Sequence, residues 1–147
     1  MKKQLYMVVT IIALVSVAGL SSAKAQTRLL LKADIPFAFS VGSKTLPAGE
    51  YILSRMSSDS SIEVLQLRSR DGHESALVRT NSVSGQIQDH GKLIFARYGD
   101  QYFFAQAWVP ANSIGMQSPR SQAEKRIERE LAARNQTKET VAVNAKR

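Results

Sequence analysis

The sequence predicts a mainly β protein, a small antiparallel β-sandwich or partly open barrel with a C-terminal α-helix. Three observations support this fold class. Apolar and polar residues alternate in several short runs between residues 33 and 112, as they do in strands that bury one face. Turn signals separate these runs at intervals of about 8–12 residues. A helix-start signal and a narrow apolar stripe then follow at 121–134.

The first 25 residues have the order of an export signal. Met1-Lys2-Lys3 is basic, an apolar run of 16 residues follows at 5–20, and Ala23 and Ala25 occupy the positions that a signal peptidase reads. We therefore expect cleavage after Ala25 and a periplasmic or secreted mature protein, without stable membrane insertion. A retained membrane anchor is the alternative, although a spanning helix needs roughly 20 apolar residues. Residues 26–32 are expected to form a short N-terminal segment.

Composition and charge narrow the class of protein. The chain has no cysteine, which excludes a disulfide framework, thiol catalysis and cysteine-ligated metals. Residues 26–119 hold nine Lys/Arg and eight Asp/Glu, whereas residues 120–147 hold eight Lys/Arg and four Glu. The nearly neutral body argues against a nucleic-acid partner, because phosphate binding needs a basic face. The basic end is either a solvated tail or a contact for anionic lipid, polysaccharide or peptidoglycan.

The first strand is expected at residues 35–41, where alternate positions are apolar. The residues that share this face are Ile35, Phe37, Phe39 and Val41. Pro36 has no backbone N–H, which places it near the start of the strand or on a sheet edge. Turns at 42–44 and 46–49 then lead into a strand that contains residues 51–53.

The segment around Asp71-Gly72 predicts a β-hairpin with a two-residue type I′ turn. Such a turn requires a positive φ at both of its central residues. Its register places two apolar pairs on one face and leaves the other face more polar. These pairs are Leu67 with Ala76 and Leu65 with Val78. The connection at 81–91 is expected to be looser, with one short strand near 83–87.

A second hairpin is predicted at 93–109, with a turn at Gly99-Asp100 and Tyr98 opposite Gln101. Regular pairing gives this hairpin one aromatic face and one smaller apolar face. The aromatic face holds Leu93, Phe95, Tyr102, Phe104 and Trp108, and the other holds Ile94, Ala96, Phe103, Ala105 and Ala107. Because both faces are apolar, the hairpin is expected to lie centrally and to be covered on both sides.

The C-terminal region predicts an amphipathic helix between two irregular segments. After the all-β domain at 33–112 and a linker at 113–120, Ser121 and Glu124 have the spacing of a capping box. The helix is expected at 121–134, with a stripe of Ala123, Ile127 and Leu131 that can pack on one surface. From residue 135 to 147 the pattern ends, and a disordered basic tail is expected.

Neither histidine lies in a pattern that predicts a metal or catalytic site. His73 adjoins the first hairpin turn and His90 lies in the turn-like segment Asp89-His90-Gly91. Their spacing, with Glu74, does not indicate the three or four converging ligands of a metal site. The sequence lacks a Gly-x-Ser-x-Gly elbow. A hydrolase with a serine, His90 and either Asp89 or another carboxylate is an alternative hypothesis. No catalytic, cofactor-binding or metal-binding residue is assigned.

The aromatic face of the second hairpin is the strongest candidate contact for a partner. If exposed, it would form a platform for sugar rings or for another protein. If buried, it would belong to the core or would carry the C-terminal helix, and we expect burial because contiguous aromatic faces are usually core. The candidate partner-contact residues are Phe95, Tyr102, Phe104, Trp108, Ile127 and Leu131.

Three stretches are informative when taken together. They are IPFAFSVGSKTLPAGEY at 35–51, LIFARYGDQYFF at 93–104 and the segment 108–124, which ends in SPRSQAE. Their combination resembles a group of small exported bacterial single-domain proteins of unknown function. This resemblance implies no catalytic or binding residue. Residues 46–51 (LPAGEY) are similar to the proline-glycine-tyrosine turn of transthyretin-like and carboxypeptidase-regulatory β-sandwich modules. That similarity implies a sandwich with a binding or structural role.

These observations favour an exported, non-enzymatic binding or structural module of the bacterial cell envelope. Its expected partner is an envelope protein or polysaccharide, and no cofactor is expected. A small hydrolase acting on envelope polymer is one alternative. The other is a self-assembling envelope protein that forms homo-oligomers through its strand edges or its helix.

Overall fold

The computed structural model describes residues 27–56 and 63–147 of the chain. The predicted export signal and its cleavage position lie outside these residues. Ten strands and one helix make up the described part. They are β1 (Thr27–Ile35), β2 (Phe39–Val41), β3 (Lys44–Leu46), β4 (Gly49–Met56), β5 (Glu63–Ser69), β6 (Ser75–Ser84), β7 (Gly91–Tyr98), β8 (Gln101–Trp108), β9 (Ile114–Gln117), α2 (Gln122–Ala132) and β10 (Glu139–Lys146).

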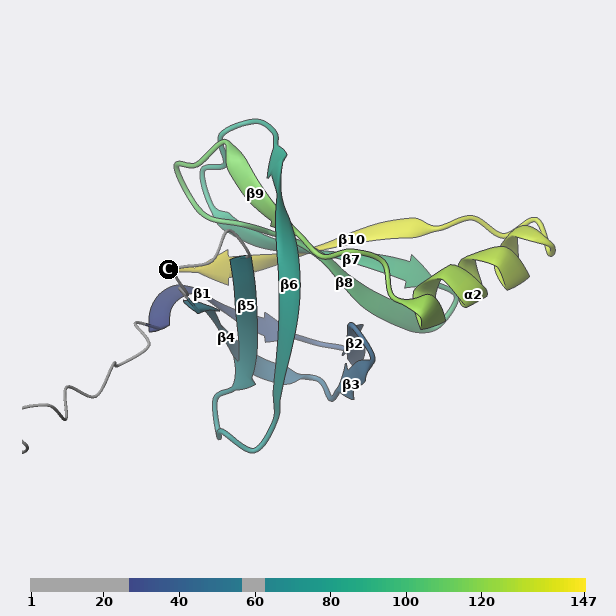
Figure 1. The fold of residues 1–147 in the computed structure, drawn as a ribbon, viewed down its shortest axis with the longest axis horizontal. Coiled ribbons are helices and arrows are strands. Elements are labelled where there is room, and N and C mark those ends of the chain that lie inside the picture. The colour runs from purple at the N-terminus through teal and green to yellow at the C-terminus, as the bar shows by residue number, and fades with distance from the viewer. Residues whose placement is uncertain (1–26, 57–62) are drawn as a thin grey trace, which may run out of the picture.

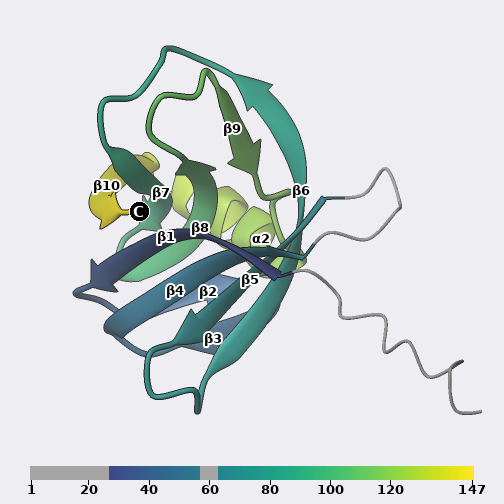
Figure 2. The same cartoon turned by 90° about the vertical axis from the view of Figure 1, so that its left-hand side faces the viewer.

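Eight of the strands close into an antiparallel barrel (Figures 1 and 2). Their order around the ring is β8-β7-β10-β1-β4-β5-β6-β9, and β9 pairs back with β8. This architecture confirms the predicted mainly β class with a helix near the C-terminus, and it shows that the barrel is closed. The strands β2 and β3 form an additional hairpin outside the ring. Within it, β2 pairs in parallel with β8 through Ser40 and Phe103.

The short strand β9 closes one half of the boundary between β6 and β8. It pairs with β6 over 81–84 and with β8 at Gln106 and Ala107. The β2–β3 hairpin lies beside the other half, where the Lys44 ammonium donates to the Ser75 carbonyl at 2.9 Å. The hairpin also adds apolar side chains that are at most 2 % exposed to the core. These are Phe39, Val41 and Leu46.

Side chains fill the interior of the barrel. Every strand of the ring contributes at least one buried apolar residue to a single cluster. The members from β1, β4 and β5 are Leu31, Ile35, Tyr51, Leu53, Leu65 and Leu67, and those from the remaining ring strands include Val78, Leu93, Phe95, Phe104, Met116 and Ala145. Because these side chains occupy the interior, the concave parts of the outer surface are where the described chain offers space to a ligand.

The strand expected at 35–41 is divided by a bend. β1 ends at Ile35, and β2 begins at Phe39. Pro36 lacks the N–H that a continued ladder would require, and this explains the break. The apolar alternation nevertheless continues through the bend, because Phe37 packs against the core between the buried Ile35 and Phe39. The predicted apolar face is therefore confirmed although the strand is not continuous.

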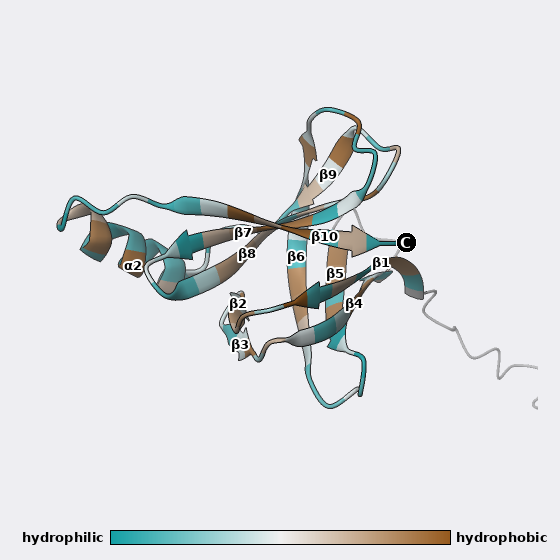
Figure 3. Ribbon diagram, turned by 180° about the vertical axis from the view of Figure 1, so that it is seen from behind, coloured by the Kyte–Doolittle hydropathy of each residue, from teal (hydrophilic) through white to brown (hydrophobic). Residues whose placement is uncertain are grey.

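The β5–β6 hairpin confirms the predicted register but not the predicted turn. Leu65 pairs with Val78 and Leu67 pairs with Ala76. These four residues are buried and alternate with less buried ones, and both strands carry hydrophobic and hydrophilic residues (Figure 3). The innermost backbone pair is Ser69 with Glu74, whose N–H and carbonyl are 2.8 Å apart. Within this longer turn Gly72, at +79°, has a positive φ, whereas Asp71 does not. The register survives because the loop gained one residue on each side.

The β7–β8 hairpin has the predicted Tyr98–Gln101 pair but contains a bulge. Ile94 pairs with Gln106, and the next pair is Phe95 with Phe104, so that Ala105 is the extra residue on β8. A single extra residue reverses which side the following residues face. Ala107 consequently joins the barrel core. On β8 the predicted faces are therefore wrong beyond Ala105. Trp108 lies on the outer side of the barrel wall instead of in the barrel interior.

Three predicted segment boundaries are wrong. β1 begins within the segment predicted at 26–32, β9 lies in the predicted linker at 113–120, and β10 lies in the predicted disordered tail at 135–147. β10 has a weak period-two pattern, and it is ordered because it pairs with β7 at seven positions from Glu139 to Ala145. A local pattern does not reveal such pairing, since β7 lies about 45 positions earlier in the sequence.

The predicted C-terminal helix is confirmed as α2. Its N-cap is Ser121, whose hydroxyl accepts the Glu124 N–H at 3.1 Å. Within residues 27–56 and 63–147, no helix is long and apolar enough to cross a membrane. α2 connects β9 to β10, and both of these strands belong to the ring. The helix is therefore held at both ends by the barrel.

Candidate functional site

The predicted partner-contact residues pack against other parts of this chain. Phe95 and Phe104 are 0 % and 3 % exposed and belong to the barrel core. The partly buried Tyr102 stacks on Phe37, with ring centroids 3.9 Å apart. The expected burial of the aromatic face is confirmed at Phe95 and Phe104. A contact between any of these residues and a partner stays a prediction.

Trp108, the sole tryptophan, is 6 % exposed and lies beneath two glycines. A Cβ atom added to Gly115 would lie 2.8 Å from the indole ring, and one added to Gly85 would be closer still. The indole Nε1 donates to the Gln106 side-chain oxygen at 3.0 Å. The close approach of both backbones therefore covers the ring, and neither position has room for a larger residue.

We expect Gly115→Val to displace the Trp108 ring. The added side chain would overlap the indole, and overpacking of this kind typically costs about 1–3 kcal/mol. Tryptophan fluorescence reports the change directly, as a red-shifted emission maximum and stronger quenching by acrylamide. Ile114→Val is the control, because Ile114 lies in the same strand and is 52 % exposed. An unchanged spectrum for Gly115→Val would contradict this packing.

The apolar stripe of α2 docks on the outer side of the β7–β8 hairpin. Ala123, Ile127 and Leu131 pack against a small cluster of Ala96, Tyr98 and Phe103. This cluster lies on the opposite face of the hairpin from Phe95 and Phe104. The sequence offered the Phe95 face as a possible docking surface for the helix, and the helix does not dock there. Phe95 and Phe104 fill the barrel instead. The hairpin is thus covered on both sides, as its two apolar faces predicted.

Within the part of the chain that the structure describes, the histidines do not converge with other metal ligands. His73 and His90 are both exposed and lie in different connections, after β5 and after β6. Among the described residues, no three His, Asp or Glu side chains are placed to hold one metal ion. Asp89 and His90 of the alternative hydrolase hypothesis lie together in an exposed bend before β7.

A serine, an aspartate and a histidine do meet in the β5–β6 turn, but without the geometry of a catalytic triad. The Asp71 carboxylate accepts the Ser69 hydroxyl at 2.5 Å and the backbone N–H of His73 at 3.1 Å. In a triad the carboxylate would orient the imidazole, which in turn would accept the proton of the serine hydroxyl. Here the carboxylate orders the turn, and the Ser69 hydroxyl bond holds the pKa of Asp71 below its usual range.

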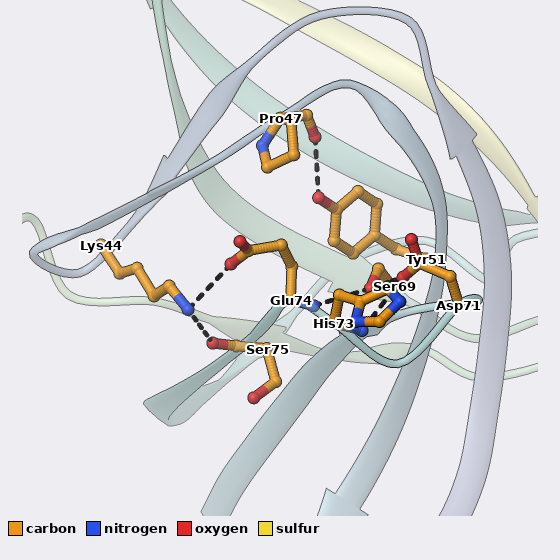
Figure 4. Close-up of polar contacts among 8 residues, drawn as sticks. All are labelled: Lys44, Pro47, Tyr51, Ser69, Asp71, His73, Glu74 and Ser75. Carbon is orange, nitrogen blue, oxygen red and sulfur yellow. Dashed lines mark hydrogen bonds and ion pairs between the residues drawn. The ribbon is translucent and has the colours of Figure 1, made fainter.

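The same end of the barrel carries a network of polar contacts around Tyr51 (Figure 4). The Tyr51 ring is buried against Phe39, and its hydroxyl donates to the Pro47 carbonyl at 2.7 Å. This bond closes the predicted proline-glycine-tyrosine turn between β3 and β4. Burial is the main reason that the pKa of Tyr51 is raised, and the nearby carboxylates of Glu74 and Asp71 add to it. Tyr51 is therefore a neutral anchor for this end of the barrel.

Two ion pairs flank Tyr51. The Lys44 ammonium lies 2.9 Å from the Glu74 carboxylate, which ties the β2–β3 hairpin to the start of β6. The Arg70 guanidinium lies 2.6 Å from the Glu50 carboxylate, and these two side chains are 75 % and 55 % exposed. An exposed pair of this kind adds little to folding stability. Both charged groups therefore stay exposed at the surface, where a ligand can contact them.

Two adjoining hollows share Glu50, Tyr51 and Arg70, and we call them together the Arg70 groove. One has a volume of about 490 Å³ and the other about 530 Å³. The first is lined by the β3–β4 and β5–β6 turns, and the second crosses the outer side of β4, β1 and β10. The charged residues that line the groove are Lys32, Arg70, Lys146 and Arg147 together with Asp34, Glu50, Asp71 and Glu74.

The groove combines equal numbers of basic and acidic side chains, four of each. Its aromatic member, Tyr51, is only 1 % exposed, so the described lining offers no stacking face for a sugar ring. Charges of both signs along an open depression suit a ligand that also carries both signs. Sequence reasoning missed this site, because its residues come from β1, β4, the β5–β6 turn and β10. The only local signal in the sequence was that each charged residue of the groove lies beside a turn or at an outward-facing position of a strand.

Comparison of this chain with protein-family models, with curated proteins and with solved structures gives no match.

Proposed function

We propose that this chain is an exported, non-enzymatic binding module of the bacterial cell envelope. The observation that carries the proposal is the Arg70 groove, an open, mixed-charge depression on a barrel whose interior is filled by side chains. Export is supported by the order of charge, apolar run and small residues at 1–25. Binding without catalysis is supported by the arrangement of Ser69, Asp71 and His73, which orders a turn.

The ligand that best fits the groove is an extended peptide segment of an envelope protein. Such a segment presents charged side chains of both signs at spacings of a few ångströms, which matches the interspersed cations and anions of the lining. Peptide N–H and carbonyl groups would also find the polar side chains of the groove. A polysaccharide usually gains affinity by stacking on an exposed aromatic ring. For the described lining, the buried Tyr51 ring does not provide one.

The test places a photo-crosslinking amino acid at Ala48, which is exposed and lines the groove. The protein is expressed in its bacterium and purified from the periplasm, and intact mass is expected to show a chain that begins at Gln26. Light should yield a discrete adduct, and peptide mapping should assign it to a protein segment. The matched control carries the same group at Asn81, which is exposed on β6 and does not line the groove.

Exchanging the charges of the Glu50–Arg70 ion pair distinguishes an effect on ligand binding from an effect on folding. Arg70→Glu alone and the double variant Glu50→Arg/Arg70→Glu should both lose at least nine-tenths of the Ala48 adduct. The double variant restores the ion pair but reverses the charges that a ligand meets. Equal adducts at Ala48 and Asn81, or an adduct that survives in the double variant, would contradict the proposal. Turnover of peptidoglycan or polysaccharide that His90→Ala abolishes would instead support the hydrolase alternative.

A further inference from the structure

A second concave site lies on the far side of the β7–β8 hairpin, under the start of α2. It has a volume of about 410 Å³ and shares no lining residue with the Arg70 groove. Its walls come from β7, β8, the end of β9, the first turn of α2 and the start of β10. Polar side chains dominate the lining, and those used below are Gln106, Arg120, Glu124 and Lys138. We call it the Glu124 pocket.

The Glu124 carboxyl is buried there for a reason other than helix capping. In a complete capping box, the glutamate side chain would reach back to the N–H of Ser121. Here the Ser121 half of the box is present, but the Glu124 carboxylate instead accepts the Tyr98 hydroxyl at 3.2 Å. The residue is 5 % exposed. A helix end therefore directs an acidic group into a pocket, where burial raises the pKa of Glu124 against the opposing effect of the Tyr98 hydrogen bond.

The two cations of the Glu124 pocket, Arg120 and Lys138, differ in whether another side chain already forms an ion pair with them. The Arg120 guanidinium binds both oxygens of Glu128, at 2.6 and 2.9 Å. Lys138 forms no ion pair with any residue in 27–56 or 63–147. It is near enough to Glu124 to lower the pKa of that carboxyl. Among the described residues, the pocket thus holds one buried anion, Glu124, and one cation without an ion-pair partner, Lys138, beside the amide of Gln106.

We propose that the Glu124 pocket binds a small zwitterion, an amino acid or short peptide with a free ammonium and a free carboxylate. The ammonium would donate to the Glu124 carboxylate, and the carboxylate would accept from the Lys138 ammonium. Charge-assisted hydrogen bonds of this kind are about twice as strong as neutral ones. The volume of the pocket is within the range of about 300–1,000 Å³ that is usual for small-molecule sites. This proposal is independent of the one for the Arg70 groove.

Dialanine is the probe, because two blocked forms of it remove one charge each. Titration of the full mature chain, followed by NMR amide shifts, should show dialanine shifting residues around the pocket such as Gln117 and Thr140. N-acetyl-dialanine, which lacks the ammonium, and dialanine amide, which lacks the carboxylate, should each bind at least tenfold more weakly. Equal binding of all three compounds, or no shift with dialanine up to its solubility limit, would overturn the proposal.

Two variants assign the charges within the pocket. Lys138→Met and Glu124→Gln should each weaken dialanine binding at least tenfold, and Glu124→Gln keeps an oxygen that can accept the Tyr98 hydroxyl. Lys125→Met is the control, because Lys125 is an exposed lysine of α2 that does not line the pocket. Both variants should retain the wild-type amide spectrum outside the pocket. Unchanged affinity in Lys138→Met would overturn the assignment of the ligand carboxylate to that residue.

The pH dependence gives a readout that a merely structural Glu124 would not produce. The charged groups around this carboxyl are Tyr98, Arg120, Glu128 and Lys138. Protonation of Glu124 removes the partner of the ligand ammonium, so dialanine binding should weaken as the pH falls from 7 to 5. The raised pKa of Glu124 starts this loss at a higher pH than an ordinary carboxyl would. Glu124→Gln should bind weakly and with no such slope, and a wild-type affinity that is flat over this range would overturn the proposal.

Discussion

Removal of residues 135–147 is expected to abolish the cooperative folding of the barrel. This segment contains β10, which stands between β7 and β1 in the ring. Its loss would remove seven paired positions with β7 and the pairing with β1, and it would expose two long strand edges. A backbone hydrogen bond contributes about 1 kcal/mol, whereas a whole domain of this size is stable by only about 5–15 kcal/mol. The lost contacts are therefore comparable to the total stability.

Circular dichroism during heating checks this result. The truncated chain should show no sigmoidal transition, or one lowered by more than 20 °C, and it should aggregate more readily because its strand edges are open. Ala142→Ser is the control, since Ala142 is an exposed residue of β10 and its substitution should leave the transition within about 2 °C. A truncated chain that melts like the full one would mean that residues 135–147 are a dispensable tail.

Phe95→Ala is expected to lower the free energy of unfolding by about 3–5 kcal/mol. Phe95 is fully buried, and its ring lies edge-on to three others, with centroids 5.2 Å from Phe37, 5.3 Å from Phe39 and 6.0 Å from Phe104. Truncation would leave a cavity at the centre of this cluster, and the closed ring of strands limits how far the neighbours can move to fill it. Urea unfolding monitored by circular dichroism measures the change.

Leu77→Ala is the matched control for this core substitution. Leu77 is also apolar and lies in the barrel wall, but it is 59 % exposed, so its truncation should change the stability by less than about 0.5 kcal/mol. A loss below about 1 kcal/mol for Phe95→Ala would contradict its place in the core. If such a variant also lost binding to an envelope partner, the original assignment of Phe95 as a partner contact would be supported.

Features that depend on near neighbours could be predicted from the sequence. The alternation of apolar residues set which side of β5 and β6 faces the core, and the turn signals at Asp71-Gly72 and Gly99-Asp100 set the register of both hairpins. Ser121 set the start of α2. These features follow from local chemistry, because period-two patterns, turn conformations and helix caps each involve residues only a few positions apart.

The closure of the barrel and the places where a ligand can bind depend on long-range contacts that no local pattern shows. The bulge at Ala105 changed the direction of Trp108, and β10 was placed by its pairing with β7 rather than by its own weak pattern. The Arg70 groove joins residues from β1, β4, the β5–β6 turn and β10, and the Glu124 pocket joins five elements. Ring closure brings distant strands together, and surface hollows form where their outward-facing side chains meet.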